Sequence, residues 1–200
     1  MREEQTNTDE RLREEPMGLT HPALKEWSAA VHALLDGRQT VLLRKGGIGE
    51  KRFEVAAQRF LFFPTVAHSH AERVRPEHRD LLAPAASDSD ANHVVLRAGA
   101  KVVAAIAVSN TGGLADIEPL HIWTEKSVRK DRLDFRPRHR LTVLVVQACP
   151  LVEPVRLART PDYAGCTSWV DVPMLPDWGT PVYDDAALRG VADRVRQAVG

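Results

Sequence analysis

Cysteine is scarce in this chain of 200 residues, and an apolar segment at the amino terminus is missing altogether. Two cysteines, Cys149 and Cys166, cannot form a disulfide framework and lack the Cys-x-x-Cys spacing of redox or zinc motifs. We expect both thiols to be reduced and structural. The polar, acidic start is unlike a signal peptide, and the longest apolar run, residues 102–108, is too short to span a membrane. These absences predict a soluble cytoplasmic protein without a membrane partner.

Net charge is also lacking, because 27 Lys and Arg residues balance 27 Asp and Glu residues. Any contact with nucleic acid therefore has to come from a local patch. Two stretches of the sequence could each form a basic patch. Residues 38–59 hold six cations against two glutamates, and residues 126–140 hold seven cations against two aspartates. A charge run of this kind forms either a solvated helix face or a surface that binds anions, and the sequence leaves both open.

Hydrophobic periodicity outlines the secondary structure. Apolar residues recur at helical spacing in four segments, which we expect to be helices: 22–35, 71–82, 124–133 and 184–199. Runs of apolar and β-forming residues predict strands at 40–44, 59–63, 141–148 and 166–172. Residues 94–97 and 102–108 are also expected to be strands, either as a pair or as one bent strand. Thr124 has the chemistry of a helix cap, and the composition of residues 84–92 predicts a flexible loop.

The order of these elements limits the fold class. Several strands follow one another without room for a crossover helix, which argues against a doubly wound parallel sheet. We therefore expect an α+β fold with a small, mainly antiparallel β-barrel or curved sheet and flanking helices. Residues 1–20 hold too few apolar side chains to pack, so we expect a disordered polar tail at 1–20 and a single domain at 21–200.

A glycine-rich stretch, LLRKGGIGEKR, occupies residues 42–52. It lacks the order of a Walker phosphate loop, because Arg44 and Lys45 precede the glycines and no serine or threonine follows a second lysine. In one interpretation, the two cations end a strand beside Gly46 and Gly47, whose permissive backbone lets amide groups approach an anion. In the other interpretation, the stretch is only a charged hairpin.

Residues with catalytic or metal-binding chemistry form no recognisable set. His68 and His70 are two residues apart, but no Cys, Asp or Glu completes a metal-ligand pattern, so we expect no metal and no cofactor. Cys166 is a candidate nucleophile with His121 or His139 as its base, although a lone cysteine is more often a small buried hydrophobe. The catalytic residues, if the protein is an enzyme, stay unassigned.

The tryptophans divide into two groups. Trp27 lies at helical spacing among apolar residues, which predicts a place in the core. Trp123 and Trp169 lie among polar and small residues near expected turns. Each of these two is either a core residue or part of a pocket wall on which a nucleic-acid base stacks.

Four stretches in order, HPALKEWSAAVHALLDGRQTVLLRKGGIGE, RFLFFPTVAHSH, PLHIWT and PDYAGCTSWVDV, resemble the bacterial family catalogued as domain of unknown function 1802. This resemblance covers residues 21–172 and implies no reaction. A more distant one concerns the residues from Gly37 to Thr40 and the strand that ends at Arg44, which look like the opening of ASCH domains in the PUA-like superfamily. It implies a small β-barrel with flanking helices and a cleft for RNA or modified bases, lined by Arg38, Thr40 and Arg44.

One departure from the ASCH pattern bears on catalysis. ASCH members that act as amidohydrolases carry a lysine at the position where this chain has Arg38. Arginine stays protonated near pH 7 and cannot serve as a general base. The resemblance therefore implies binding more readily than hydrolysis.

These observations predict a protein that binds nucleic acid or a nucleotide-like anion, with RNA or a modified nucleotide as its partner. The residues expected at the site are Arg38, Thr40, Arg44, Lys45, Gly46, Gly47, Trp123 and Trp169. One alternative is a hydrolase or nuclease that acts on a nucleotide-like substrate through Cys166 or through His68 and His70. Another is a protein-interaction module built on the terminal helix and the acidic tail. The sequence leaves the oligomeric state open.

Overall fold

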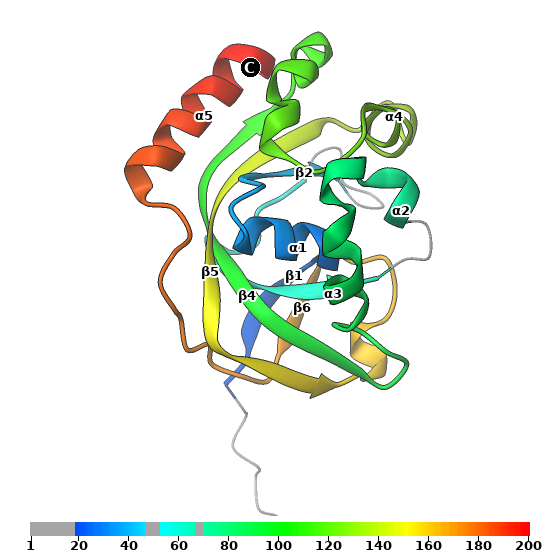
Figure 1. The fold of residues 1–200 in the computed structure, drawn as a ribbon, viewed down its shortest axis with the longest axis vertical. Coiled ribbons are helices and arrows are strands. Elements are labelled where there is room, and N and C mark those ends of the chain that lie inside the picture. Colours follow the sequence, from blue (N-terminus) through cyan, green and yellow to red (C-terminus); the bar gives the residue numbers. More distant parts are fainter. Residues whose placement is uncertain (1–18, 47–52, 67–69) are drawn as a thin grey trace, which may run out of the picture.

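The computed structural model describes residues 19–46, 53–66 and 70–200, without the side chain of His70. Most of the tail predicted at 1–20, together with Gly47 and His68, lies outside these residues. The described chain forms one curved sheet with short helices packed around it (Figure 1). None of its helices has the length and apolar composition needed to cross a membrane.

The sheet has six strands in the order β2-β5-β4-β3-β1-β6. Four of the five neighbouring pairs are antiparallel, and only β1 and β3 run parallel. The expected α+β fold with a curved, mainly antiparallel sheet is thereby confirmed. The strands are β1 His21–Trp27, β2 Val41–Lys45, β3 Arg59–Thr65, β4 His93–Ala107, β5 Leu141–Ala158 and β6 Trp169–Val172.

The two longest strands, β4 and β5, give the sheet its curvature. Their antiparallel register shifts between Leu96 and Ala98, and again between Val102 and Ala104. Such bulges bend a strand and increase its local twist, and Figure 1 shows both strands curling along the length of the molecule. Residues 93–107 are therefore one bent strand and not a strand pair.

Helices cover the sheet from several sides. The longest, α5 Asp185–Val199, packs against β4, β5 and the 3-10 helix η2 Thr111–Leu120 (Figure 1). Thr124 caps α4 as predicted, since its hydroxyl accepts a hydrogen bond from the Ser127 N–H at 3.2 Å. The remaining elements are α1 Ser28–Leu35, α2 His70–Arg73, η1 Pro76–Leu81, α3 Leu82–Ala86, α4 Glu125–Val128, the π-helical turn η3 Arg129–Asp134 and η4 Pro161–Tyr163.

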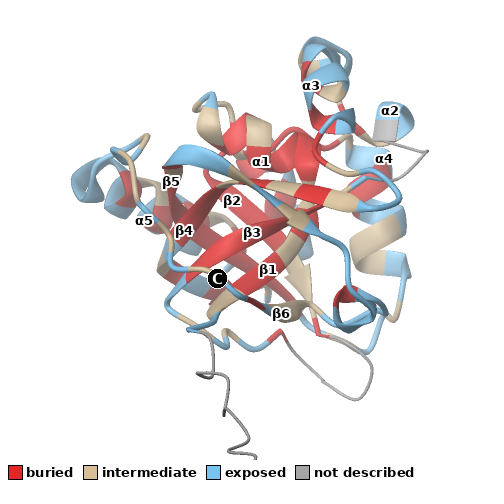
Figure 2. Cartoon of the chain, turned by 90° about the horizontal axis from the view of Figure 1, so that it is seen from below, coloured by how far each residue is buried: buried red, intermediate tan, exposed pale blue. Residues whose placement is uncertain are grey.

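Successive side chains of β2 point to opposite faces of the sheet, so neighbouring residues pack into different clusters. Leu42 packs inside the curve of the sheet in the same cluster as Phe60. Leu43 lies on the other face, in the cluster that includes the apolar side of α5. Figure 2 shows buried residues along the neighbouring strands. Arg44 therefore shares the inner face with Leu42, and Lys45 shares the outer face with Leu43.

The helix predicted at 22–35 is wrong in its first half, where the chain forms β1. Residues 21–27 lie between β3 and β6, and Ala23 pairs with Leu61 on one side and with Val170 on the other. This tertiary pairing outweighs the helical spacing of the apolar residues. The helix begins only at Ser28.

Four further expectations need correction. The helix expected at 71–82 is divided into α2, η1 and α3 around Pro76, because proline has no N–H for a helix interior. The loop expected at 84–92 is packed, since α3 continues to Ala86 and Asp88 is only 1% exposed. The charged hairpin expected after β2 does not join paired strands, because β2 pairs with β5. The strand expected at 166–172 begins only at Trp169.

Candidate anion-binding site

A cavity of about 390 Å³ lies where the ends of β1 and β2 meet η3 and the segment before β6. We call it the basic pocket, because five of its described lining side chains are cations and one is a carboxylate. Its lining residues are Lys25, Trp27, Leu43, Arg44, Lys45, Gly46, Thr65, Asp131, Arg132, Phe135, Arg136, Gly165, Cys166, Thr167 and Ser168. Three residues predicted from the sequence, Arg44, Lys45 and Gly46, thus lie at one site.

Arg44 is held by an ion pair with Glu26 at 3.0 Å. The same nitrogen donates a hydrogen bond to the Lys25 carbonyl at 3.1 Å, and the guanidinium lies 5.0 Å from the centre of the Phe53 ring. Only 13% of the Arg44 side chain and 5% of the Glu26 side chain are exposed. Arg44 therefore connects β2 to β1, which are not neighbours in the sheet, and its charge is largely compensated.

Lys45 is also engaged by the protein. Its ammonium group donates hydrogen bonds to the carbonyl oxygens of Leu133, Phe135 and Arg136, at 3.3, 2.5 and 2.9 Å. Burial lowers the pKa of this amine, and the nearby Arg132 charge lowers it further. Lys45 therefore holds the end of η3 and the following turn in place, which positions the wall of the basic pocket.

Arg132 differs from these two cations because it has no carboxylate partner in the described part of the chain. Its one hydrogen bond there runs from Nη1 to the Asp131 carbonyl at a long 3.4 Å. Burial lowers the pKa of the guanidinium, Glu26 raises it, and the neighbouring Arg44 lowers it. Arginine nevertheless stays protonated at neutral pH. The Glu26 and Asp131 charges act on it from a distance, but Arg132 makes no direct ion pair with the described residues and keeps several donors free.

A second cavity of about 300 Å³, which we call the flanking pocket, lies beside the basic pocket. The two cavities share Lys45 and Arg132. The flanking pocket also contains Arg138, His139 and Arg140 from the second cation cluster of the sequence. Both predicted charge clusters therefore contribute to one region of the surface, with Arg132 between its two halves.

The structure does not bring Arg38 to this region. Arg38 pairs with Asp80 at 2.8 Å and with Asp36 at 3.4 Å, and it lines another cavity of about 220 Å³ together with Thr40. The expectation that Arg38, Thr40 and Arg44 share one cleft is therefore wrong. The chain turns at Gly37 with φ 71°, and β2 begins only at Val41, so the alternation of the strand does not extend back to Arg38.

Neither predicted stacking tryptophan opens onto the basic pocket. Trp123 is 7% exposed and packs edge-to-face on Trp27 with ring centres 5.1 Å apart. Trp169 stacks on Phe53 at 6.1 Å, and its indole N–H donates to the Glu54 carbonyl at 3.2 Å. The aromatic rings described in the lining of the basic pocket are those of Phe135 and of Trp27, which the sequence assigned to the core.

The catalytic alternatives receive little support from the geometry. Cys149 is 1% exposed, as predicted, and burial raises the pKa of its thiol. Cys166 is exposed and lines the basic pocket, but none of the lining residues described is a histidine. His121 and His139 line two other cavities. Among the described residues, no group of three His, Cys, Asp or Glu side chains is arranged to hold a metal ion.

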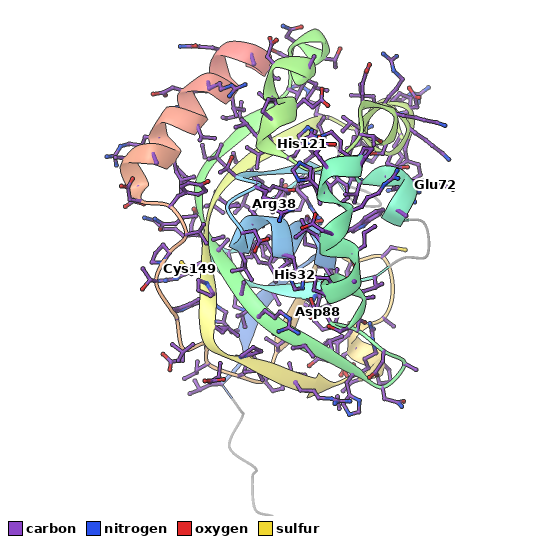
Figure 3. The ribbon with its side chains drawn as sticks, viewed as in Figure 1. His32, Arg38, Glu72, Asp88, His121 and Cys149 are labelled. Carbon is purple, nitrogen blue, oxygen red and sulfur yellow. The ribbon has the colours of Figure 1, made fainter. Side chains whose placement is uncertain are left out.

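A buried charge network was missed by sequence reasoning. Asp88 accepts hydrogen bonds from the Ser28 hydroxyl, from His32 Nε2 at 2.7 Å and from Arg97 Nε at 2.5 Å. Figure 3 shows His32 and Asp88 facing each other between α1 and the segment after α3. All three donors contact the same carboxylate, so this is not a serine–histidine–aspartate relay. The network instead attaches α1 and β4 to the segment around Asp88.

His121 is a second buried polar residue that the sequence did not place. It is 2% exposed, and its Nδ1 accepts a hydrogen bond from the Trp123 N–H at 3.2 Å. Burial lowers the pKa of the ring to about 3, with smaller contributions from the charges of Arg75 and His78. His121 is therefore neutral in the folded protein at any pH near 7.

Acid should destabilise the fold through His121. Below pH 6.5 the unfolded chain binds a proton on this ring while the folded chain does not, so the free energy of unfolding falls as the pH drops toward about 3. Between pH 7 and pH 5 the loss should be about 2 kcal/mol. Urea denaturation at pH 7 and at pH 5 measures this loss in the free energy of unfolding. The His121→Gln variant lacks the titrating ring, so its loss between the two pH values should be smaller by about the same 2 kcal/mol. An equal loss in both proteins would contradict a buried, neutral His121.

The described residues define an α+β protein with a curved, mainly antiparallel sheet and a basic pocket at one of its edges. The chain belongs to the family Domain of unknown function (DUF1802), whose model matches residues 23–194. A comparison with curated proteins gives no match.

Among solved structures, the chain is similar to ASCH from Zymomonas mobilis, with a TM-score of 0.43, 12% identity, and coverage of 90% of this chain and 95% of that chain. Two point mutants of the same protein match with TM-scores of 0.41 and 0.42, each at 14% identity, and cover 86% of this chain and 94% and 96% of theirs. The resemblance to domain of unknown function 1802 drawn from the sequence is thereby confirmed. A likeness at this level says nothing about ligand or reaction.

Proposed function

We propose that the protein binds nucleic acid through the basic pocket, with Arg132 as the principal phosphate ligand. The observation that carries the proposal is that Arg132, which lines both cavities, makes no direct ion pair with the described residues. Arg44 is already paired with Glu26, and Lys45 donates to three carbonyl oxygens, but Arg132 has donors to spare. A guanidinium matches a phosphate by paired hydrogen bonds, and partial burial strengthens such a contact.

The distribution of charge favours a polymer over a single nucleotide. The basic pocket and the flanking pocket lie on either side of Arg132, and each has further cations in its wall. Lys25 and Arg136 line the first, and Arg138 and Arg140 line the second. Consecutive phosphates of a single strand would meet a cation in each half, whereas a mononucleotide would use only one half.

Binding is favoured over hydrolysis by the same set of residues. A nuclease needs a general base near the phosphate, and the described lining of the basic pocket includes Asp131 as its one carboxylate. Asp131 accepts a hydrogen bond from Arg73 Nε at 2.6 Å, which holds it as an ion pair. Cys166 brings a thiol to the wall without a histidine beside it in that lining.

Replacing Arg132 by alanine should weaken the binding of a fluorescent single-stranded RNA about tenfold at low salt, because one phosphate contact is lost. The dependence of log K on log salt concentration should flatten by about 0.7. Fluorescence anisotropy over a salt series measures both. Arg132→Lys should bind between the two, since lysine keeps the charge but not the paired hydrogen bonds.

The matched control is Arg189→Ala, an exposed arginine on α5 outside both pockets. It should bind RNA as the unchanged protein does. If the unchanged protein binds no single-stranded RNA at low salt, or if Arg132→Ala and Arg189→Ala bind equally well, the proposal fails.

A further inference from the structure

A third cavity, of about 150 Å³, lies between η2 and α4 and adjoins the flanking pocket. Apolar side chains make up much of its wall, among them Leu114, Val128 and Leu133. Its buried polar residue is His121, which lies toward the end of the molecule that carries η2 and α4 (Figure 3). We call this cavity the His121 cavity.

One nitrogen of the His121 ring is left without a partner. Nδ1 is occupied by the Trp123 N–H, so the proton of the neutral ring resides on Nε2. No described residue accepts a hydrogen bond from Nε2. Nε2 is not among the completely buried unsatisfied atoms, so the donor stays accessible. Because His121 lines the cavity, this donor is available to a molecule inside it.

The walls of the cavity are fixed in advance. On one side, η2 is pressed against the end of α5 so closely that a Cβ on Gly113 would lie 1.8 Å from the Ala198 carbonyl oxygen. On the other side, α4 is held by its Thr124 cap and by the Ser127 hydroxyl, which donates to the Arg73 carbonyl at 3.2 Å. A ligand would therefore meet a preformed site, which lowers the entropy cost of binding.

The charges around the cavity select against anions. Glu118 and Glu125 lie in its wall, and Arg129 is the only cation among the described lining residues. Glu118 also pairs with Arg75 at 3.4 Å. This arrangement contrasts with the basic pocket, where five cations face one carboxylate. A phosphate or a carboxylate would be repelled here, and a neutral molecule would not.

We propose that the His121 cavity is a second ligand site, which takes a small neutral molecule with an apolar ring and a carbonyl acceptor. The carbonyl accepts a hydrogen bond from His121 Nε2, and the ring packs against Leu114, Val128 and Leu133. A cyclic amide has this chemistry. The site adjoins the flanking pocket, with which it shares Thr111 and Leu133, but His121 and the two glutamates give it a different selectivity.

The test uses three probes of similar ring size: 2-pyridone, benzene and benzoate. Each is titrated into the full chain, and the His121 ring is followed by ¹H–¹⁵N NMR. We expect 2-pyridone to shift the Nε2 signal in a saturable manner and to bind about tenfold more tightly than the other two, since they lack a neutral carbonyl acceptor. The proposal would be overturned if benzene bound as tightly as 2-pyridone, if benzoate bound more tightly than 2-pyridone, or if the cavity took up water alone.

Two variants at His121 separate the donor from the structural role of the ring. His121→Asn keeps an acceptor near the Trp123 N–H but has no donor at the Nε2 position, and should bind 2-pyridone about tenfold more weakly. His121→Gln places an amide N–H close to that position and should retain most of the binding. Equal affinities of the two variants would contradict the proposed hydrogen bond.

A third variant avoids the core altogether. Ala115 is an exposed residue in the cavity wall, and Ala115→Trp should fill the cavity without removing a buried group. It should abolish the binding of 2-pyridone and leave the binding of single-stranded RNA unchanged. Unaltered 2-pyridone binding would place that ligand elsewhere on the protein and overturn the proposal.

Discussion

Replacing Asp88 by alanine should lower the free energy of unfolding by about 3–5 kcal/mol, because the change removes the common acceptor of a buried network. Ser28, His32 and Arg97 all donate to this carboxylate, which is 1% exposed. Without it, Ser28 and His32 lose their common acceptor and the Arg97 guanidinium loses its counter-charge. Urea denaturation measures the loss as a lower transition midpoint with an unchanged slope.

The matched control for this experiment is Asp193→Ala on α5. Asp193 is exposed and pairs with Arg196 at 2.7 Å on the surface, so its loss should be well below 1 kcal/mol. Similar stabilities of the two variants would show that the Asp88 network contributes little. Burial opposes ionisation of Asp88, but the hydrogen bonds from His32, Ser28 and Arg97 outweigh it and hold the pKa below the ordinary 3.8. The stabilisation is therefore complete at neutral pH and is lost only as the pH falls below 3.8.

Arg44→Ala should also destabilise the protein by about 3–5 kcal/mol, because it leaves the Glu26 carboxylate buried without its cation. Among the described residues, Glu26 then keeps the Trp27 N–H, at 2.8 Å from its other oxygen, as its one hydrogen-bond donor. The double variant Glu26→Met with Arg44→Met should recover most of this loss, since two apolar side chains of similar length remove the burial of charge. Urea denaturation of the two single variants and the double variant gives the coupling energy between Glu26 and Arg44.

The stability of Arg44→Ala also affects how the RNA-binding experiments are interpreted. Weaker RNA binding by Arg44→Ala would reflect a disturbed β1–β2 connection as much as a lost phosphate contact, whereas Arg132 has no such ion pair in the described residues. If Arg44→Ala is as stable as the surface control Arg189→Ala, the ion pair with Glu26 is not a structural element. Arg44 would then be a candidate phosphate ligand, as the sequence suggested.

Much of the architecture could be predicted from local pattern. The strands around 41–45 and 141–148 and the terminal helix with its Asp184 cap have apolar periodicity and capping chemistry that need no tertiary information. Residues 21–27 show the limit of such reasoning. Their apolar spacing suits a helix, but β3 and β6 offer backbone partners on both sides, and only the fold brings those strands there.

The candidate site was predicted in part. The sequence identified Arg44, Lys45 and Gly46 and both cation clusters, and the structure joins these around the basic pocket. It did not single out Arg132 from the seven cations of its cluster. Whether a cation is free or compensated depends on the carboxylates and carbonyls that other segments bring to it, and one sequence cannot show these.

By itself, the sequence determined what depends on neighbours along the chain. It fixed the balance of charge, the position of the cation clusters, the main strands and the amphipathic helix at the carboxyl terminus. Only the tertiary structure decided the pairing of Arg44 with Glu26, the burial of Asp88 in a stretch of loop-like composition, and the unpartnered nitrogen of His121. The physical reason is that hydrogen bonds and ion pairs act over a few ångströms in space, and their strength depends on burial that distant segments create.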